Sequence, residues 1–222
     1  MQITTNNNNT AVSLQPEFKD VRDKIYLRMM CGEHKEILQF IPHIMLEDMA
    51  VIFFILPEPE PQNTSRAWET APIVSFSDLE LWGVSKESLF KTAMENDARD
   101  FPAVIDTLAN RLMLLNGEEP GEIRQEKGLI YVLTNTKMFL GASCILYPGI
   151  PDKIAKRLEG SYYVIPSSIH EMLLIPESEM IDTGEMRSIV REINASEVLV
   201  RSEVLSDNIY YYDAGKKCLR TV

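Results

Sequence analysis

The longest strongly apolar stretch in this chain of 222 residues is only eight residues long, from Met49 to Leu56. A helix that crosses a membrane needs about 20 apolar residues, so we expect no membrane partner. The short run is instead typical of a β-strand that is buried on both faces, which we predict over Val51–Leu56. Three prolines at alternate positions in residues 57–62 end this strand.

The segment before this strand has the spacing of a helix. Apolar residues recur every three or four positions from Phe18 to Met29, which places them on one face of an α-helix. Pro16 suits an early helical position and Gly32 suits a helix end. We therefore predict one helix from Pro16 to Gly32.

Helix-capping patterns mark the rest of the first half. Ser77 and Glu80 match a Ser-x-x-Glu capping box, in which each side chain bonds the backbone N–H group of the other residue. This pattern predicts a short helix over residues 78–82, and Ser85 is expected to cap a second helix. A further helix is expected over Phe101–Leu115.

A polar, turn-rich stretch at residues 116–128 predicts a long loop. The loop could divide the chain in two, but neither half alone has an obviously complete core. We therefore predict a single domain over residues 16–222, with a soft boundary in this loop. The polar, Asn-rich residues 1–15 predict a disordered N-terminal stub.

The second half is richer in strand patterns. Tyr162–Ile165 and Ile169–Ile175 predict a hairpin, and helices are expected over Pro151–Leu158 and after Asp182. The short apolar run Ala142–Tyr147 fits a strand or a buried helix, and we favour a strand. The expected fold class is α+β, with a helical first half that holds a short buried strand. The second half adds antiparallel hairpins and two helices.

The charge, the N-terminus and the cysteines of the chain indicate which partners and which compartment to expect. Its 33 acidic and 22 basic residues give a net charge of −11. Such a surface repels a phosphate backbone, so we expect no nucleic-acid partner. The N-terminus has neither the basic nor the apolar region of a secretory signal, and three widely spaced cysteines favour reduced thiols over a disulfide framework. These features predict a cytoplasmic protein.

Metal and cofactor motifs are missing from the sequence. The three histidines are His34, His43 and His170, and only His34 lies near a cysteine, Cys31. Without a second pair nearby, a tetrahedral zinc site lacks ligands, so we predict no metal site. The chain has no Gly-x-Gly-x-x-Gly or Walker A pattern, and no cofactor is predicted.

Two groups of side chains could support catalysis. Cys144 and His170 could form a nucleophile and its base, although a cysteine in an apolar run usually behaves as a small buried hydrophobe. Ser167 and Ser168 lie close to His170 in the sequence, but the chain has no Gly-x-Ser-x-Gly elbow. Their hydroxyls are better explained as bonding the backbone of a Pro-Ser-Ser turn.

Four motifs follow one another in the second half, namely Thr134–Lys137, Gly141–Gly149, Ile165–Glu171 and Leu205–Tyr210. In this order they resemble a bacterial family of unknown function, domain of unknown function 5688. The resemblance extends over about residues 16–213, and a more distant likeness is to domain of unknown function 1444. The resemblance implies a bacterial protein and implies no activity.

Polar and aromatic side chains of these motifs are the candidates for a binding site. In a strand, Tyr210, Tyr211 and Tyr212 alternate between two faces. One or two of them would then be exposed, as in a protein interface, unless the strand packs aromatic rings on both faces. The candidate binding residues are Asn135, Ser143, Ser167, His170, Glu171, Asp207 and Tyr210.

The sequence therefore favours a non-catalytic binding or regulatory protein that acts through protein–protein or small-ligand contacts. The alternative is a small hydrolase or transferase that uses His170 with one of the three candidate nucleophiles named above. The two hypotheses differ in whether these side chains converge in one pocket. No pattern in the sequence specifies an oligomeric state.

Overall fold

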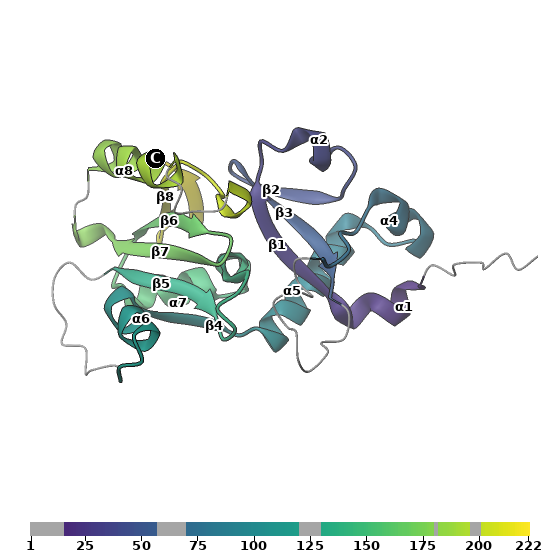
Figure 1. The fold of residues 1–222 in the computed structure, drawn as a ribbon, viewed down its shortest axis with the longest axis horizontal. Coiled ribbons are helices and arrows are strands. Elements are labelled where there is room, and N and C mark those ends of the chain that lie inside the picture. Colours follow the sequence, from purple (N-terminus) through teal and green to yellow (C-terminus); the bar gives the residue numbers. More distant parts are fainter. Residues whose placement is uncertain (1–15, 57–69, 120–129, 180–181, 196–200) are drawn as a thin grey trace, which may run out of the picture.

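The computed structural model describes five segments of the chain, which build two antiparallel sheets with helices around them (Figure 1). The described residues are 16–56, 70–119, 130–179, 182–195 and 201–222. The expected N-terminal stub, and most of the expected loop 116–128, lie outside them. Among the described helices, none is both long enough and apolar enough to span a membrane. The architecture is of the α+β class that the sequence predicts.

The first sheet has three strands in the order β1-β3-β2. They are β1 (Ile25–Cys31), β2 (His43–Leu46) and β3 (Met49–Ile55). The central strand β3 is the apolar run of the sequence, and its residues from Met49 to Phe54 are at most 2% exposed. Leu38 of α2 (Lys35–Leu38) covers one face of β3, and Leu89 of α5 (Lys86–Asp100) covers the other. The predicted strand with two covered faces is therefore confirmed.

The predicted helix from Pro16 to Gly32 is wrong for most of its length. Only α1 (Phe18–Val21) and one turn of 3₁₀ helix, η1 (Arg22–Lys24), precede strand β1. The apolar residues of this segment also fit a period of two, and alternate side chains from Ile25 to Met29 are at most 1% exposed. Pairing of β1 along the full length of β3 decides between the two periods, which local spacing cannot do.

Helix α5 also completes the outer edge of β1. The Asn96 side chain donates to the backbone oxygens of Arg22 and Ile25 at 2.8 and 2.9 Å. The Asp97 carboxylate accepts the Leu27 N–H at 2.7 Å, and burial raises the pKa of Asp97 well above its usual range. These bonds satisfy backbone groups that an edge strand would otherwise leave open to another chain. Strand β1 therefore depends on a helix that is distant in the sequence.

Both predicted helix caps correspond to a helix, but the cap of the first helix lies two residues earlier than predicted. Helix α4 spans Phe76–Trp82 and begins after Ser75, not after Ser77. The Ser75 Oγ accepts the Asp78 N–H at 3.2 Å, and the Asp78 carboxylate accepts the Ser75 N–H at 2.7 Å. Ser85 caps α5 as predicted, because its Oγ accepts a backbone N–H of the first turn at 3.2 Å.

The second sheet has six antiparallel strands in the order β4-β5-β7-β6-β8-β9. They are β4 (Ala103–Thr107), β5 (Tyr131–Asn135), β6 (Tyr162–Ser168), β7 (Glu171–Pro176), β8 (Tyr210–Asp213) and β9 (Cys218–Thr221). The expected β6–β7 hairpin is confirmed, although its turn lies at Ile169 and His170 rather than at Pro166–Ser168.

The predicted helix over Phe101–Leu115 is wrong in its first part. Residues of this part form β4, and only Leu108–Leu115 is helix, α6. Strand β4 pairs with β5, which follows the long loop in the sequence, so no local pattern marks it. The Thr107 Oγ1 accepts the Asn110 N–H at 3.2 Å and caps α6 directly at the end of the strand.

The apolar run Ala142–Tyr147, expected as a strand, is instead the 3₁₀ helix η2 (Gly141–Leu146). Its first five residues are buried, and a fully buried segment has no polar face from which its period can be read. The two helices expected in this half are α7 (Ile150–Arg157) and α8 (Thr183–Ala195). Short 3₁₀ turns form η3 (Glu177–Glu179) and η4 (Arg201–Glu203).

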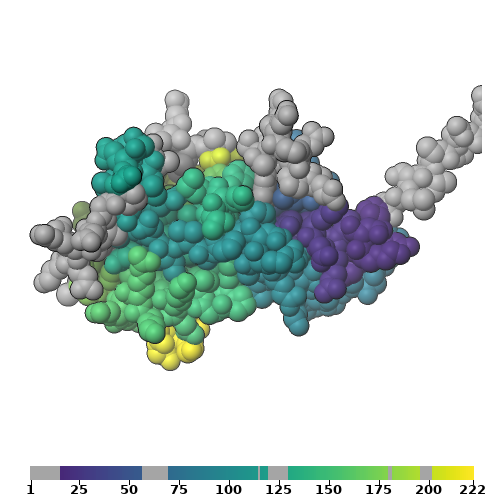
Figure 2. Space-filling view, turned by 90° about the horizontal axis from the view of Figure 1, so that it is seen from below, coloured from purple at the N-terminus to yellow at the C-terminus, as the bar shows by residue number. Residues whose placement is uncertain are grey.

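One hydrophobic cluster runs through both sheets. It includes Leu27 and Phe53 of the first sheet, Leu133 and Leu174 of the second, and Leu89 of α5. Figure 2 shows the blue-teal segment that contains α5 between the purple N-terminal part and the green part of the second sheet. The two sheets of the described segments therefore share one core.

Candidate functional site

The motifs of the second half meet where the start of η2 packs against the β6–β7 turn. We call loop 136–140, together with Gly141 and His170, the junction. A Cβ atom on Gly141 would lie 2.7 Å from both the Asn135 nitrogen and the His170 carbonyl oxygen, which leaves room for glycine alone. The Thr134 hydroxyl donates to the same carbonyl at 2.9 Å. Close backbone packing therefore fixes the position of His170.

The His170 ring is held on three sides. Its Nδ1 accepts the Leu140 N–H at 3.1 Å, and its ring centroid lies 4.8 Å from that of Phe139. On the other side, Nε2 lies 3.6 Å from Oε1 of Glu203. Because Nδ1 accepts a hydrogen bond, the neutral imidazole carries its proton on Nε2, facing Glu203. This tautomer has no free lone pair with which to deprotonate a nucleophile.

Asn135 and Ser143 hold the junction loop in place. The Asn135 side chain accepts the Lys137 N–H at 2.9 Å and donates to the Phe139 carbonyl at 2.8 Å. The Ser143 hydroxyl donates to the Leu140 carbonyl at 3.0 Å. Asn135 is 3% exposed and Ser143 is 1% exposed. The structure brings Asn135, Ser143 and His170 to one loop, as the sequence motifs suggest, but their polar groups bond the protein itself.

The candidate nucleophiles are buried or engaged. Cys144 is 0% exposed, and burial raises the pKa of its thiol to about 12, so it carries its proton at neutral pH. The Ser168 Oγ accepts the His170 backbone N–H at 3.1 Å, which is the local turn bond expected for a Pro-Ser-Ser sequence. Ser167 and Glu171 are half-buried neighbours of this turn.

Asp207 and Tyr210 belong to a second group of contacts, around Asp48 of the β2–β3 turn. The Tyr210 hydroxyl donates to the Asp48 carboxylate, and the Ser206 hydroxyl donates to it at 2.7 Å. Asp207 is exposed and accepts the Asn194 amide at 2.8 Å. This group ties the second sheet to the first, and the Asp48 carboxylate accepts its hydrogen bonds from within the chain.

The three tyrosines of β8 pack mainly inward. Tyr210 and Tyr212 are at most 5% exposed and Tyr211 is half-buried. The Tyr212 ring stacks on Tyr162 at 5.0 Å between centroids, and the Tyr211 hydroxyl donates to Glu177 at 2.7 Å. The row is therefore an aromatic strand packed on both faces.

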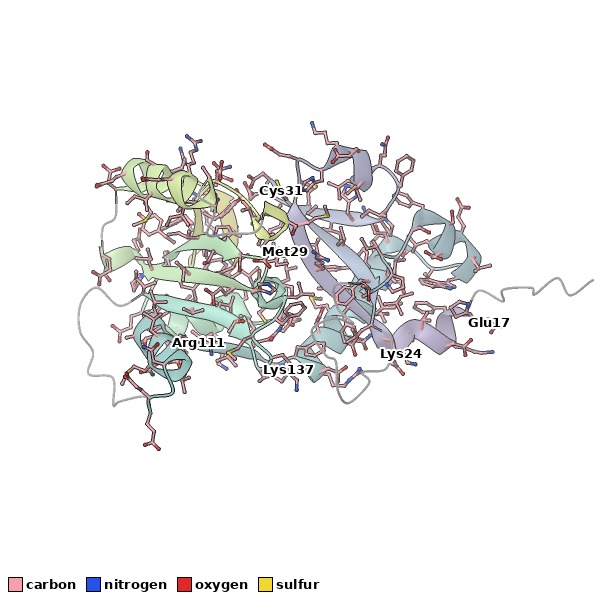
Figure 3. All side chains as sticks on the ribbon, in the orientation of Figure 1. Glu17, Lys24, Met29, Cys31, Arg111 and Lys137 are labelled. Carbon is pink, nitrogen blue, oxygen red and sulfur yellow. The ribbon has the colours of Figure 1, made fainter. Side chains whose placement is uncertain are left out.

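A groove that no sequence motif marks lies over the face of the first sheet that carries α2. It has a volume of about 350 Å³, and strands β1 and β3, the α2 segment and η4 contribute to its walls. Arg28 pairs with Ile52 across the β1–β3 ladder, so both lie on its floor. Figure 3 labels Met29 and Cys31 at the side of β1 near the second sheet, and Arg28 alternates with them. The lining residues are Arg28, Met30, His34, Ile37, Ile52, Ile73 and Ser202.

Arg28 brings a hydrogen-bond donor to this groove. Its Nε is buried and has no hydrogen-bond partner within the described part of the chain. Burial lowers the pKa of the guanidinium, and the Glu203 carboxylate partly offsets this effect. A buried donor without an acceptor costs about 1–3 kcal/mol, so a ligand oxygen that reached this Nε would recover part of that cost. Glu203 also faces His170 and therefore lies between the groove and the junction.

Exposed apolar side chains border the groove. Ile37 and Ile73 line it and are 43% and 41% exposed. Phe40 and Phe76, each three residues further along the chain, are 66% and 43% exposed, and their backbones are joined by a hydrogen bond of 3.4 Å. Clustered exposed apolar side chains of this kind mark binding surfaces.

Sequence reasoning missed this groove because it assigned the segment around Arg28 to a helix. On a helix, Arg28 would lie seven residues after Val21, at the edge of the apolar stripe, where its charged end can reach solvent. On a strand, it alternates with the buried Leu27 and Met29 and joins Met30 on the opposite face. The period-two spacing of Ile25, Leu27 and Met29 was the one available signal.

Comparison with curated proteins gives no match, and neither does comparison with solved structures. Within the described segments, no three His, Cys, Asp or Glu side chains gather as metal ligands would. One family model, described as a family of unknown function (DUF5688), matches residues 1–214. The match includes the first sheet, all strands of the second sheet except β9, and all four motifs of the second half, and the chain therefore belongs to the DUF5688 family.

Proposed function

We propose that this protein is a non-catalytic binding protein and that the groove on the first sheet is its binding site. The observation that carries the proposal is Arg28, which lines a mainly apolar groove and whose buried Nε has no described acceptor. Small-molecule sites are typically apolar hollows of about 300–1,000 Å³ with a few polar groups. The groove, at about 350 Å³, falls at the small end of that range.

The alternative, a hydrolase or transferase built on His170, has less support. The Nδ1 of His170 accepts a backbone N–H, and its Nε2 faces Glu203. The thiol of Cys144 is buried with a pKa of about 12. A ligand at the junction would have to displace hydrogen bonds that hold the loop, whereas a ligand in the groove would add one that is missing.

We further propose that the protein acts in the bacterial cytoplasm and has no nucleic-acid partner. Cys31, Cys144 and Cys218 are all free, which suits a reducing compartment. The net charge of −11 opposes binding to a phosphate backbone. Both statements remain independent of what occupies the groove.

A neutral probe tests the site itself. We expect 1-octanol, added to methyl-labelled protein, to shift the NMR signals of Met30, Ile37 and Ile52. Ile73→Glu should weaken these shifts, because it places a charge at the rim of the groove. The matched control is Leu112→Glu on α6, where the leucine is 52% exposed. Shifts that are absent, or that both variants reduce equally, would refute the proposed site.

A further inference from the structure

We infer that the natural ligand of the groove is a small amphipathic carboxylate, whose carboxylate binds Arg28 and whose aliphatic chain lies on the apolar lining. The inference rests on the proposed function, because it names the ligand class of the same site. The apolar lining side chains that would contact the chain are Met30, Ile37, Ile52 and Ile73.

The charges of the lining favour an anion. Arg28 and His34 are bases, and none of the lining residues is acidic, although the chain as a whole carries a net charge of −11. His34 already has an acidic neighbour, because its Nδ1 lies 3.5 Å from Glu36 Oε1. Arg28 keeps its charge at every physiological pH. Arg28 is therefore the anchor for an anionic head group.

The geometry of arginine favours a carboxylate head group. A guanidinium presents parallel N–H groups, and the side-on pair formed by Nε and one Nη matches the two oxygens of a carboxylate. In Arg28 the buried Nε has no acceptor within the described residues. A neutral alcohol could satisfy one of these donors but not both.

Two other arginines of the described segments, Arg111 and Arg187, also have a buried Nε without a described partner, but Arg28 differs from both. Arg187 donates through Nη2 to the Val222 carbonyl. Arg111 lies on α6, in the other half of the molecule (Figure 3). Of the three, Arg28 is the one that lines this groove, and Arg111 provides a matched control for its removal.

Glu203 is expected to weaken the binding of an anion to Arg28. Its carboxylate is the charge that favours the protonated form of Arg28, and the same carboxylate lies 3.6 Å from His170 Nε2. A bound carboxylate would share Arg28 with Glu203 and would be repelled by it. Neutralising Glu203 should therefore strengthen binding of the anion and leave binding of a neutral ligand unchanged.

Calorimetric titration with octanoate and 1-octanol tests the inference. We expect the wild-type protein to bind octanoate at least about tenfold more tightly than 1-octanol. Arg28→Gln should abolish this difference while 1-octanol still binds, which shows that the groove is intact. Arg28→Lys should restore only part of it. Arg111→Gln should bind both probes as the wild type does, and Glu203→Gln should bind octanoate more tightly.

Several outcomes would overturn the inference. If octanoate binds no better than 1-octanol, water satisfies Arg28 and the groove recognises no anion, although the proposed function survives. If neither probe binds, the proposed function fails as well. If Arg28→Gln leaves octanoate affinity unchanged, the head group lies elsewhere. If a leucine-ended peptide binds through Arg28 more tightly than octanoate, the occupant is a protein terminus instead of a small acid.

Chain length provides an independent measurement on the same protein. From hexanoate to octanoate, each added methylene should lower the Kd by up to about fourfold, since its burial removes apolar surface from water. The gain should cease when the groove of about 350 Å³ is filled. An affinity independent of chain length would mean that the lining does not hold an aliphatic chain.

Discussion

The junction and the groove both place polar groups in apolar surroundings. They differ in whether those polar groups have hydrogen-bond partners within the described chain. At the junction, Asn135, Ser143 and His170 each hydrogen-bond to the loop that they surround. In the groove, the buried Nε of Arg28 has no described acceptor. Buried polar groups that are satisfied stabilise a fold, whereas an unsatisfied one costs stability and calls for a separate reason. The contrast teaches that the motif-rich segment maintains architecture and that the groove is the better candidate for function.

Gly141→Ala should have the largest effect on stability. Its Cβ would lie 2.7 Å from the Asn135 nitrogen and the His170 carbonyl oxygen, and neither backbone atom can move alone. We expect the free energy of unfolding to fall by about 3 kcal/mol in urea titrations. Gly160→Ala is the control, because a Cβ there meets nothing within 4 Å. Equal stabilities of the two variants would show that the junction is not tightly packed.

Asn135→Ala should have the next largest effect. It removes the acceptor of the Lys137 N–H and the donor to the Phe139 carbonyl. We expect a loss of about 2 kcal/mol in the free energy of unfolding, together with faster amide exchange at Leu140. Asn116→Ala, at an exposed position after α6, should change stability by less than about 0.5 kcal/mol. A stable Asn135→Ala variant would leave this residue free to act as a ligand-binding group.

Arg28→Met should have the smallest effect on stability, and it should raise the free energy of unfolding instead of lowering it. It removes a buried donor that lacks a described acceptor and keeps an aliphatic stem on the floor of the groove. We expect the free energy of unfolding of the ligand-free protein to rise by about 1 kcal/mol. Arg157→Met removes a hydrogen bond of 2.6 Å to the Ile105 carbonyl and should not be stabilising. If Arg28→Met instead lowers the free energy of unfolding, Arg28 stabilises the fold. The groove and the junction would then not differ in this respect.

The parts of the fold that the sequence predicts are those decided by local chemistry. Ser85 caps α5, Asp182 accepts the Gly184 and Glu185 N–H groups at the start of α8, and Met49–Phe54 is a covered strand. The wrong assignments share a different cause. Strand β1 requires pairing with β3 and edge bonds from α5, and β4 requires pairing with β5. In both segments a long-range partner overrides local spacing.

The candidate site divides in the same way. Of the candidate residues, Asn135, Ser143 and His170 all hydrogen-bond to the loop 136–140. Asp207 and Tyr210, from the same motifs, turn instead to Asn194 and Asp48. The sequence does not predict that Arg28 lines a groove, because this depends on the face of β1 that carries its side chain.

Composition and residues that are neighbours along the chain account for the α+β class, the apolar central strand and the caps of α5 and α8. The order of the motifs likewise accounts for the resemblance to the family. The tertiary structure decided that β1 is a strand, and with it which side of that strand carries Arg28. A period of two and a period near four share too many positions over seven residues to be told apart locally. The pairing of β1 with β3 places Arg28 next to Ile52, and both residues line the groove.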